Sequence, residues 1–65
     1  MNILQFRIEY LDLAGDVVRH EIISVESRRI AHRRAQDRLL VMQQNRPEIL
    51  AYRVKQMASD HDGNR

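Results

Sequence analysis

The chain has no cysteine and no tryptophan, and only one proline and two glycines among its 65 residues. Without cysteine it cannot form a disulfide or a thiolate-bound metal site, so the redox state of its compartment is left open. Gly15 and Gly63 lie far apart, which excludes a glycine-rich phosphate-binding loop. No apolar run approaches the roughly 18 residues that cross a bilayer. MNILQF at the N-terminus lacks the features of a signal peptide, so we expect a soluble, cytoplasmic protein with no membrane contact.

A chain of 65 residues makes one domain with a small core. A chain this short buries only about 60% of the surface that its unfolded form exposes. The hydrophobic fraction of 43% is typical of a folded domain. Because no disulfide can add stability, a partner chain is one way to supply it. We expect a single domain over residues 1–57 and a flexible polar tail over 58–65.

Two segments near the N-terminus have the patterns of strands. Residues 3–11 alternate with period two, and residues 17–25 are rich in β-branched side chains. Between them, Asp12 suits the first position of a type I turn, and Gly15 can adopt the left-handed conformation that closes a short hairpin. The apolar face of the first strand holds Leu4, Phe6, Ile8 and Tyr10.

A hairpin register can be predicted from charge. If Asp12 pairs with Asp16, Ile8 faces His20, and two opposite-charge pairs form, Glu9 with Arg19 and Arg7 with Glu21. This register puts Ile23 and Val25 on the outer face of the sheet. A bulge in the second strand would instead turn both inward, and we leave the two possibilities open.

Residues 28–44 are predicted to form one helix. Ser27 is a suitable N-cap, and the Arg46–Pro47 step ends the helix because the residue before proline is pushed out of the helical region. Residues 49–57 return to period two, with Leu50, Tyr52 and Val54 on the inner face. The sequence therefore predicts a small α+β protein of the ββαβ type. Its three strands form an antiparallel sheet in the order 2-1-3, with the helix packed on one face.

The helix is rich in arginine. Residues 27–45 contain five arginines and one acid, Asp37. On a helical projection Arg34 and Arg38 fall beside the apolar arc, so each must extend along its edge or pair with an acid. The outward stripe holds Arg29, Arg33, Gln36 and Leu40. This stripe is either a solvated charged face or a contact surface for an anionic partner.

Two kinds of partner fit such a stripe. A nucleic acid would meet the guanidinium groups of Arg28, Arg29 and Arg33 with its phosphates, although the net charge is only +2. A protein partner would use Arg29, Arg33, Gln36 and Leu40, together with Ile23 and Val25 if they lie on the outer sheet face. That apolar outer face, with the two free sheet edges, also favours a homodimer.

Catalysis has little support in the sequence. His20 is expected at the edge of the core, and His32 has Gln36 rather than an acid or histidine four residues away. The tail residues Asp60, His61 and Asp62 could bind a metal only loosely. A single-layer sheet with one helix also leaves little room for a pocket of several hundred cubic ångströms. We expect no enzyme, no cofactor and no metal site.

The segments FRIEY and AGDVV follow a layout that resembles many small ββαβ proteins, including those of phages and mobile elements. Such an architecture does not give a function. We predict a non-enzymatic small binding module that acts by protein–protein interaction, as an inhibitor or adaptor of the phage or mobile-element type. The alternative is a nucleic-acid-binding accessory protein that uses the arginine-rich helix.

Overall fold

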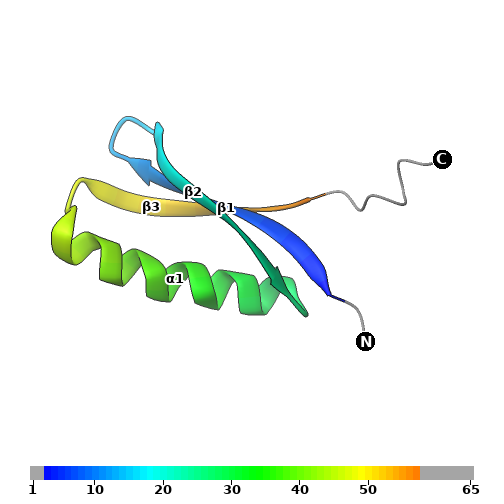
Figure 1. Ribbon diagram of the computed structural model, residues 1–65. Helices are drawn as coiled ribbons and strands as arrows, with labels where there is room; N and C mark the ends of the chain where they lie inside the picture. Colours follow the sequence, from blue (N-terminus) through cyan, green and yellow to red (C-terminus); the bar gives the residue numbers. More distant parts are fainter. Residues whose placement is uncertain (1–2, 58–65) are drawn as a thin grey trace.

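The computed structural model describes residues 3–57 and has the element order β-β-α-β (Figure 1). The strands pair antiparallel in the order β2-β1-β3, and the helix covers one face of the sheet, which confirms the predicted fold class. The predicted tail, residues 58–65, lies outside the described residues. The elements are β1 (Leu4–Asp12), β2 (Val17–Val25), α1 (Arg28–Asn45) and β3 (Ile49–Gln56).

The β1–β2 turn is closed by Asp12 and Gly15, as the sequence predicts. The Asp12 carboxylate accepts hydrogen bonds from the backbone N–H groups of Ala14 and Asp16, at 3.0 and 2.9 Å. Gly15 has a φ of 87°, in the left-handed region that a side chain rarely tolerates. Local turn chemistry therefore fixes where β1 ends and β2 begins.

A β-bulge in β2 shifts the hairpin by one residue from the predicted register. Leu11 faces Val17, but Tyr10 faces Arg19, so Val18 is an extra residue on β2. Beyond this point Glu9 faces His20. The predicted pairs of Glu9 with Arg19, Arg7 with Glu21 and Ile8 with His20 are therefore wrong, because the one-residue shift moves every later side chain to the opposite face.

The shift decides which β2 side chains enter the core. Val25 is only 3% exposed, and Ile23 packs against Phe6, Ile8 and their neighbours. Ile22 and His20 turn outward instead. The outer-face placement of Ile23 and Val25 is thus wrong, and the bulge that we left open as the alternative is present.

A second irregularity lies at the start of β3. Asp12 faces Ile49 and Leu11 faces Ala51, so Leu50 is the extra residue. The prediction that Leu50 lies on the inner face is therefore wrong: Leu50 is 48% exposed, and its neighbour Ile49 is fully buried instead. The reason is again one extra residue in a strand, which moves the neighbouring side chains to the opposite face of the sheet. Here it lies at the start of β3, beside the end of β1.

Helix α1 begins and ends where the sequence predicts. The Ser27 hydroxyl accepts a hydrogen bond from the Ile30 N–H at 3.3 Å, and the Arg46 N–H donates to the Met42 carbonyl at 2.8 Å. Ala31 and Ala35 are its fully buried residues, so small side chains let the helix approach the sheet closely. The helix contacts β3 more than β1 or β2 (Figure 1). The core between the two layers contains Phe6, Ile8, Tyr10, Val25, Ala31, Ala35 and Ile49.

The close helix–sheet approach gives a stability prediction. Replacing Ala35 by Leu inserts three carbons where no space is open, and overpacking of this kind costs typically about 1–3 kcal/mol. We expect urea denaturation to show this loss in the free energy of unfolding. Gln36→Leu is the matched control, because the adjacent side chain is exposed. Equal stabilities for the two variants would contradict the observed packing.

Candidate binding surfaces

The outer face of α1 carries the four residues predicted to form its outward stripe. We call Arg29, Arg33, Gln36 and Leu40 the helix face. All four side chains are exposed, and Leu40 is 61% exposed. They follow one another at helical spacing on the side opposite Ala31 and Ala35, so they form one continuous surface that faces away from the sheet.

The arginines of the described chain divide into two groups. Arg7, Arg38, Arg46 and Arg53 each lie within 4.0 Å of a carboxylate of the same chain. Residues 3–57 place no carboxylate within that distance of Arg28, Arg29, Arg33 or Arg34 on α1, nor of Arg19 on β2. The helix face therefore presents guanidinium groups whose hydrogen-bond donors are open to an external partner.

Arg28 has a different role from its neighbour Arg29. Its guanidinium carbon lies 5.7 Å from the centroid of the Phe6 ring, a cation–π distance. Arg28 is exposed, and its guanidinium group lies over the ring of a core residue. Of the three residues predicted to bind phosphate, Arg29 and Arg33 belong to the helix face, and Arg28 lies beside the Phe6 ring.

Arg38 pairs with an acid, which is one of the two outcomes expected from its position beside the apolar arc. Its guanidinium lies 3.3 Å from Glu21, and the same carboxylate accepts a 2.7 Å hydrogen bond from the Tyr10 hydroxyl. Burial raises the pKa of Tyr10, and the bond to Glu21 acts in the same direction. The bulge makes this possible, because it brings Glu21 to the helix side of the sheet.

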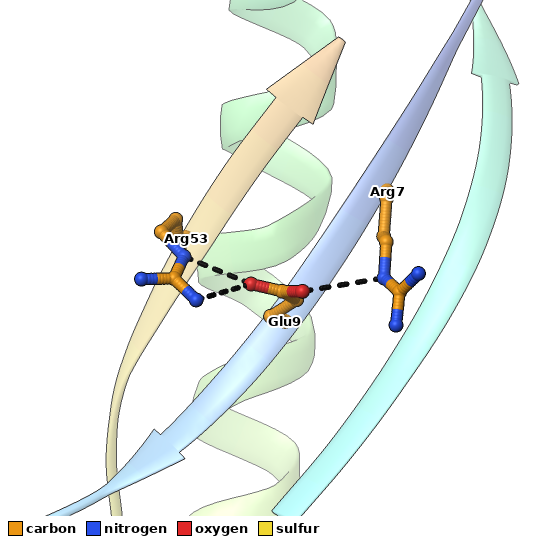
Figure 2. Close-up of polar contacts among 3 residues, drawn as sticks. All are labelled: Arg7, Glu9 and Arg53. Atoms are coloured by element: carbon orange, nitrogen blue, oxygen red, sulfur yellow. Dashed lines mark hydrogen bonds and ion pairs between the residues drawn. The ribbon is translucent and has the colours of Figure 1, made fainter. Parts of the chain in front are cut away.

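A buried carboxylate lies on the opposite, open face of the sheet. Glu9 is 5% exposed and is held between Arg53 of β3 and Arg7 of its own strand (Figure 2). Arg53 donates from Nε at 2.8 Å and from an η nitrogen at 2.6 Å, both to the same Glu9 oxygen. The Arg7 Nε lies 3.2 Å from the other oxygen, as an ion pair without hydrogen-bond geometry.

The charge balance of this cluster is positive. The Arg53 hydrogen bonds lower the pKa of Glu9, and this effect outweighs burial, which acts in the other direction. Lys55 directly faces Arg7 across the β1–β3 pair. Like charges in such positions are unfavourable unless an anion lies near, and Glu9 supplies one. The cluster therefore stabilises the sheet while leaving its open face cationic.

The two histidines of residues 3–57, His20 and His32, lie on opposite sides of the sheet. His32 contacts the Tyr52 ring edge-on, with its Nδ1 3.3 Å from the Tyr52 hydroxyl. His20 lies on the open face of the sheet, not at the core edge as predicted, because the bulge turns it outward. Residues 3–57 contain no group of three or more His, Cys, Asp or Glu that could hold a metal. The tail motif of Asp60, His61 and Asp62 lies outside the described residues.

Hollows of several hundred cubic ångströms are present at the surface, although the sequence indicates little room for them. One of about 300 Å³ lies between Arg19 on β2 and the C-terminal half of α1, where Arg38 and Met42 line it. Another, of about 540 Å³, is lined by Leu13 and Leu50 near the hairpin turn. Arginine and apolar side chains, with Asn45, line the first of these hollows. The second is mainly apolar but also has the carboxylates of Asp12 and Glu48 in its lining.

The chain matches no protein-family model, no curated protein and no solved structure. Within the part of the chain that the structure describes, no helix has the length and apolar character needed to cross a membrane. The helix face, the cluster around Glu9 and the two hollows are therefore the features from which a function can be proposed.

The Glu9 cluster predicts a specific pH dependence. Because the folded-state pKa of Glu9 is below its ordinary value of 4.5, its contribution to stability is present above that pH and is lost as the pH falls through the lowered value. Glu9→Gln should therefore be less stable than the unmodified chain at neutral pH, with the difference shrinking in acid. Denaturant unfolding followed by circular dichroism at several pH values measures the stability difference at neutral pH and its decrease in acid.

Asp37→Asn is the matched control, since Asp37 is exposed and residues 3–57 place no cation within 4.0 Å of it. We expect it to change the free energy of unfolding little at any pH. A Glu9→Gln difference that stays constant from neutral to acidic pH would mean that the carboxylate charge is not what stabilises the cluster.

Proposed function

We propose that this chain is a non-enzymatic binding module that contacts an acidic surface of a protein partner through its helix face. The single observation that carries the proposal is the state of Arg29 and Arg33. Both are exposed, and no carboxylate of residues 3–57 lies within 4.0 Å of either. A module of this kind acts as an inhibitor or adaptor by covering the surface that it binds.

The residue types of the helix face suit protein contact. Arg29 and Arg33 are four residues apart and therefore one turn apart, so their guanidinium forks can engage neighbouring carboxylates. Leu40 supplies an apolar contact at the far end, and Val41 beside it is 58% exposed. Arginine is among the residues that most often dominate binding energy at interfaces, and an apolar contact next to it excludes water.

Nucleic acid fits this surface less well. Arg28, one of the three residues in a phosphate-binding reading, stacks on Phe6. Asp37 adds a negative charge to the exposed side of α1. Among the described phenylalanine and tyrosine residues, Phe6 and Tyr10 are fully buried and Tyr52 contacts His32, so none of these rings is available on the open sheet face for base stacking. Nucleic-acid binding is therefore the alternative that the experiment must distinguish from protein binding.

The test is capture of partners from a cell lysate with and without nuclease, followed by affinity measurement with the purified partner. Arg29→Ala combined with Arg33→Ala should weaken binding about tenfold or more. Arg34→Ala combined with Lys55→Ala is the matched control, because it removes the same charge from exposed positions outside the helix face. We expect the control to bind within about threefold of the unmodified chain.

Two results would overturn the proposal. Equal binding by both double variants would remove the helix face from the interface. Loss of capture after nuclease treatment would assign the surface to nucleic acid. In that case the logarithm of the binding constant should fall with the logarithm of salt concentration, with a slope of roughly −0.9 per phosphate neutralised.

A further inference from the structure

The hollow between β2 and the C-terminal half of α1 has an apolar floor. Its volume of about 300 Å³ is at the lower end of the range that small-molecule sites occupy, roughly 300–1,000 Å³. Met42 of α1 and Ile49 of β3 line it, and both belong to the same core cluster. Val41, which is 58% exposed, lines it as well. The hollow therefore offers an apolar surface that the core beneath it holds in place.

Three arginines line the same hollow, and their charges are not fully balanced. Arg38 lies 3.3 Å from Glu21, and Arg46 lies 2.9 Å from Glu48. Arg19 is exposed, and the described part of the chain places no carboxylate within 4.0 Å of it. Three guanidinium groups and two carboxylates leave one positive charge, and that charge is at Arg19.

The bulge in β2 is what brings Arg19 to this side of the sheet. Arg19 faces Tyr10 on β1, and the Tyr10 side chain is fully buried between the sheet and the helix. Residues directly opposite each other lie on the same face of a sheet, so the Arg19 side chain leaves the strand on the face that α1 covers. In a strand without the extra residue, Val18, Arg19 would face Glu9 and lie on the open face instead.

We propose that this hollow binds a single carboxylate that carries an apolar group, such as a small organic acid or the last residue of a peptide. The carboxylate pairs with the guanidinium fork of Arg19, a geometry that favours two parallel hydrogen bonds. Asn45, which also lines the hollow, has an amide that can donate a further hydrogen bond. The apolar group lies against Met42 and Ile49, where it is removed from water.

The remaining charge selects a carboxylate over a phosphate. A carboxylate balances the one charge at Arg19, whereas a phosphate monoester carries roughly −1.5 to −2 and exceeds it. The carboxylates of Glu21 and Glu48, which hold the other two arginines, would repel the excess charge. Inorganic phosphate also has no apolar group to cover the floor of the hollow.

Ligand titration followed by amide correlation spectra of the isotope-labelled chain tests the proposal. N-acetyl-L-phenylalanine should bind with a Kd of about 1 mM, which is typical of the ligand efficiency of small molecules. Its largest shift changes should fall on Arg19, Met42 and Asn45. The carboxamide of the same compound lacks the charge, and acetate lacks the apolar group. Each of these two, and inorganic phosphate, should bind about tenfold more weakly or less.

Variants of the hollow give a second readout. Arg19→Gln should weaken binding of N-acetyl-L-phenylalanine about tenfold or more, because the carboxylate loses its partner. Lys55→Gln is the matched control, since it removes the same charge from an exposed position on the opposite, open face of the sheet. We expect it to bind within about twofold of the unmodified chain. Asn45→Phe fills the hollow without changing its charge and should also prevent binding, while circular dichroism confirms folding.

Three results would overturn the proposal: no saturable shift up to about 20 mM N-acetyl-L-phenylalanine, equal binding of its carboxamide or of phosphate, or equal binding by Arg19→Gln and Lys55→Gln. A peptide with a C-terminal phenylalanine distinguishes the two sources of the ligand. Tighter binding of the peptide assigns the site to a chain terminus, and equal binding assigns it to a small acid. Because no residue that lines this hollow belongs to the helix face, failure here leaves the partner-binding proposal standing.

Discussion

One extra residue in β2 determines how the two faces of this sheet are composed. With Val18 inserted opposite Tyr10, the later residues of β2 change sides. Val25 completes the core beside Phe6, and Glu21 reaches both Tyr10 and Arg38 on the helix side. Because side chains alternate along a strand, no smaller adjustment could produce the same result. Which β2 side chains join the core and which lie on the open face both follow from this single irregularity.

Some arginines of this small chain hold its elements together, whereas others are free of carboxylate partners within the described residues. Arg53 fastens β3 to the central strand through Glu9, and Arg38 ties α1 to β2 through Glu21. These contacts take the place of some of the apolar burial that a domain of this size cannot supply. Arg29 and Arg33 form no ion pair with any carboxylate of residues 3–57, so the fold does not depend on ion pairs at these two positions. That contrast, more than the number of arginines, makes α1 of interest as a contact surface.

The architecture could be read from the sequence because its signals are local: the alternation of Phe6, Ile8 and Tyr10, the Ser27 cap and the stop at Pro47. The bulge in β2 could be raised only as an alternative and the one in β3 was not predicted, since no nearby residue pattern distinguishes a regular strand from one in which Val18 or Leu50 is extra. They are set by which side chains best fill the space under α1. The contact between Glu9 and Arg53 was equally hidden, because it joins positions 44 residues apart and needs the β1–β3 register. The helix face was accessible to prediction because helical periodicity alone defines it.

The central position of β1 has a consequence for how the chain folds. Its contacts with β2 are local and close a short loop, whereas those with β3 join Phe6 to Gln56 across most of the sequence. A two-stranded hairpin is only marginally stable in water by itself, so it gains lasting order only when the distant strand docks with the helix. Formation of the hairpin and docking of β3 therefore stabilise each other. We expect thermal unfolding to be a single cooperative transition, without a populated intermediate in which only the hairpin is formed.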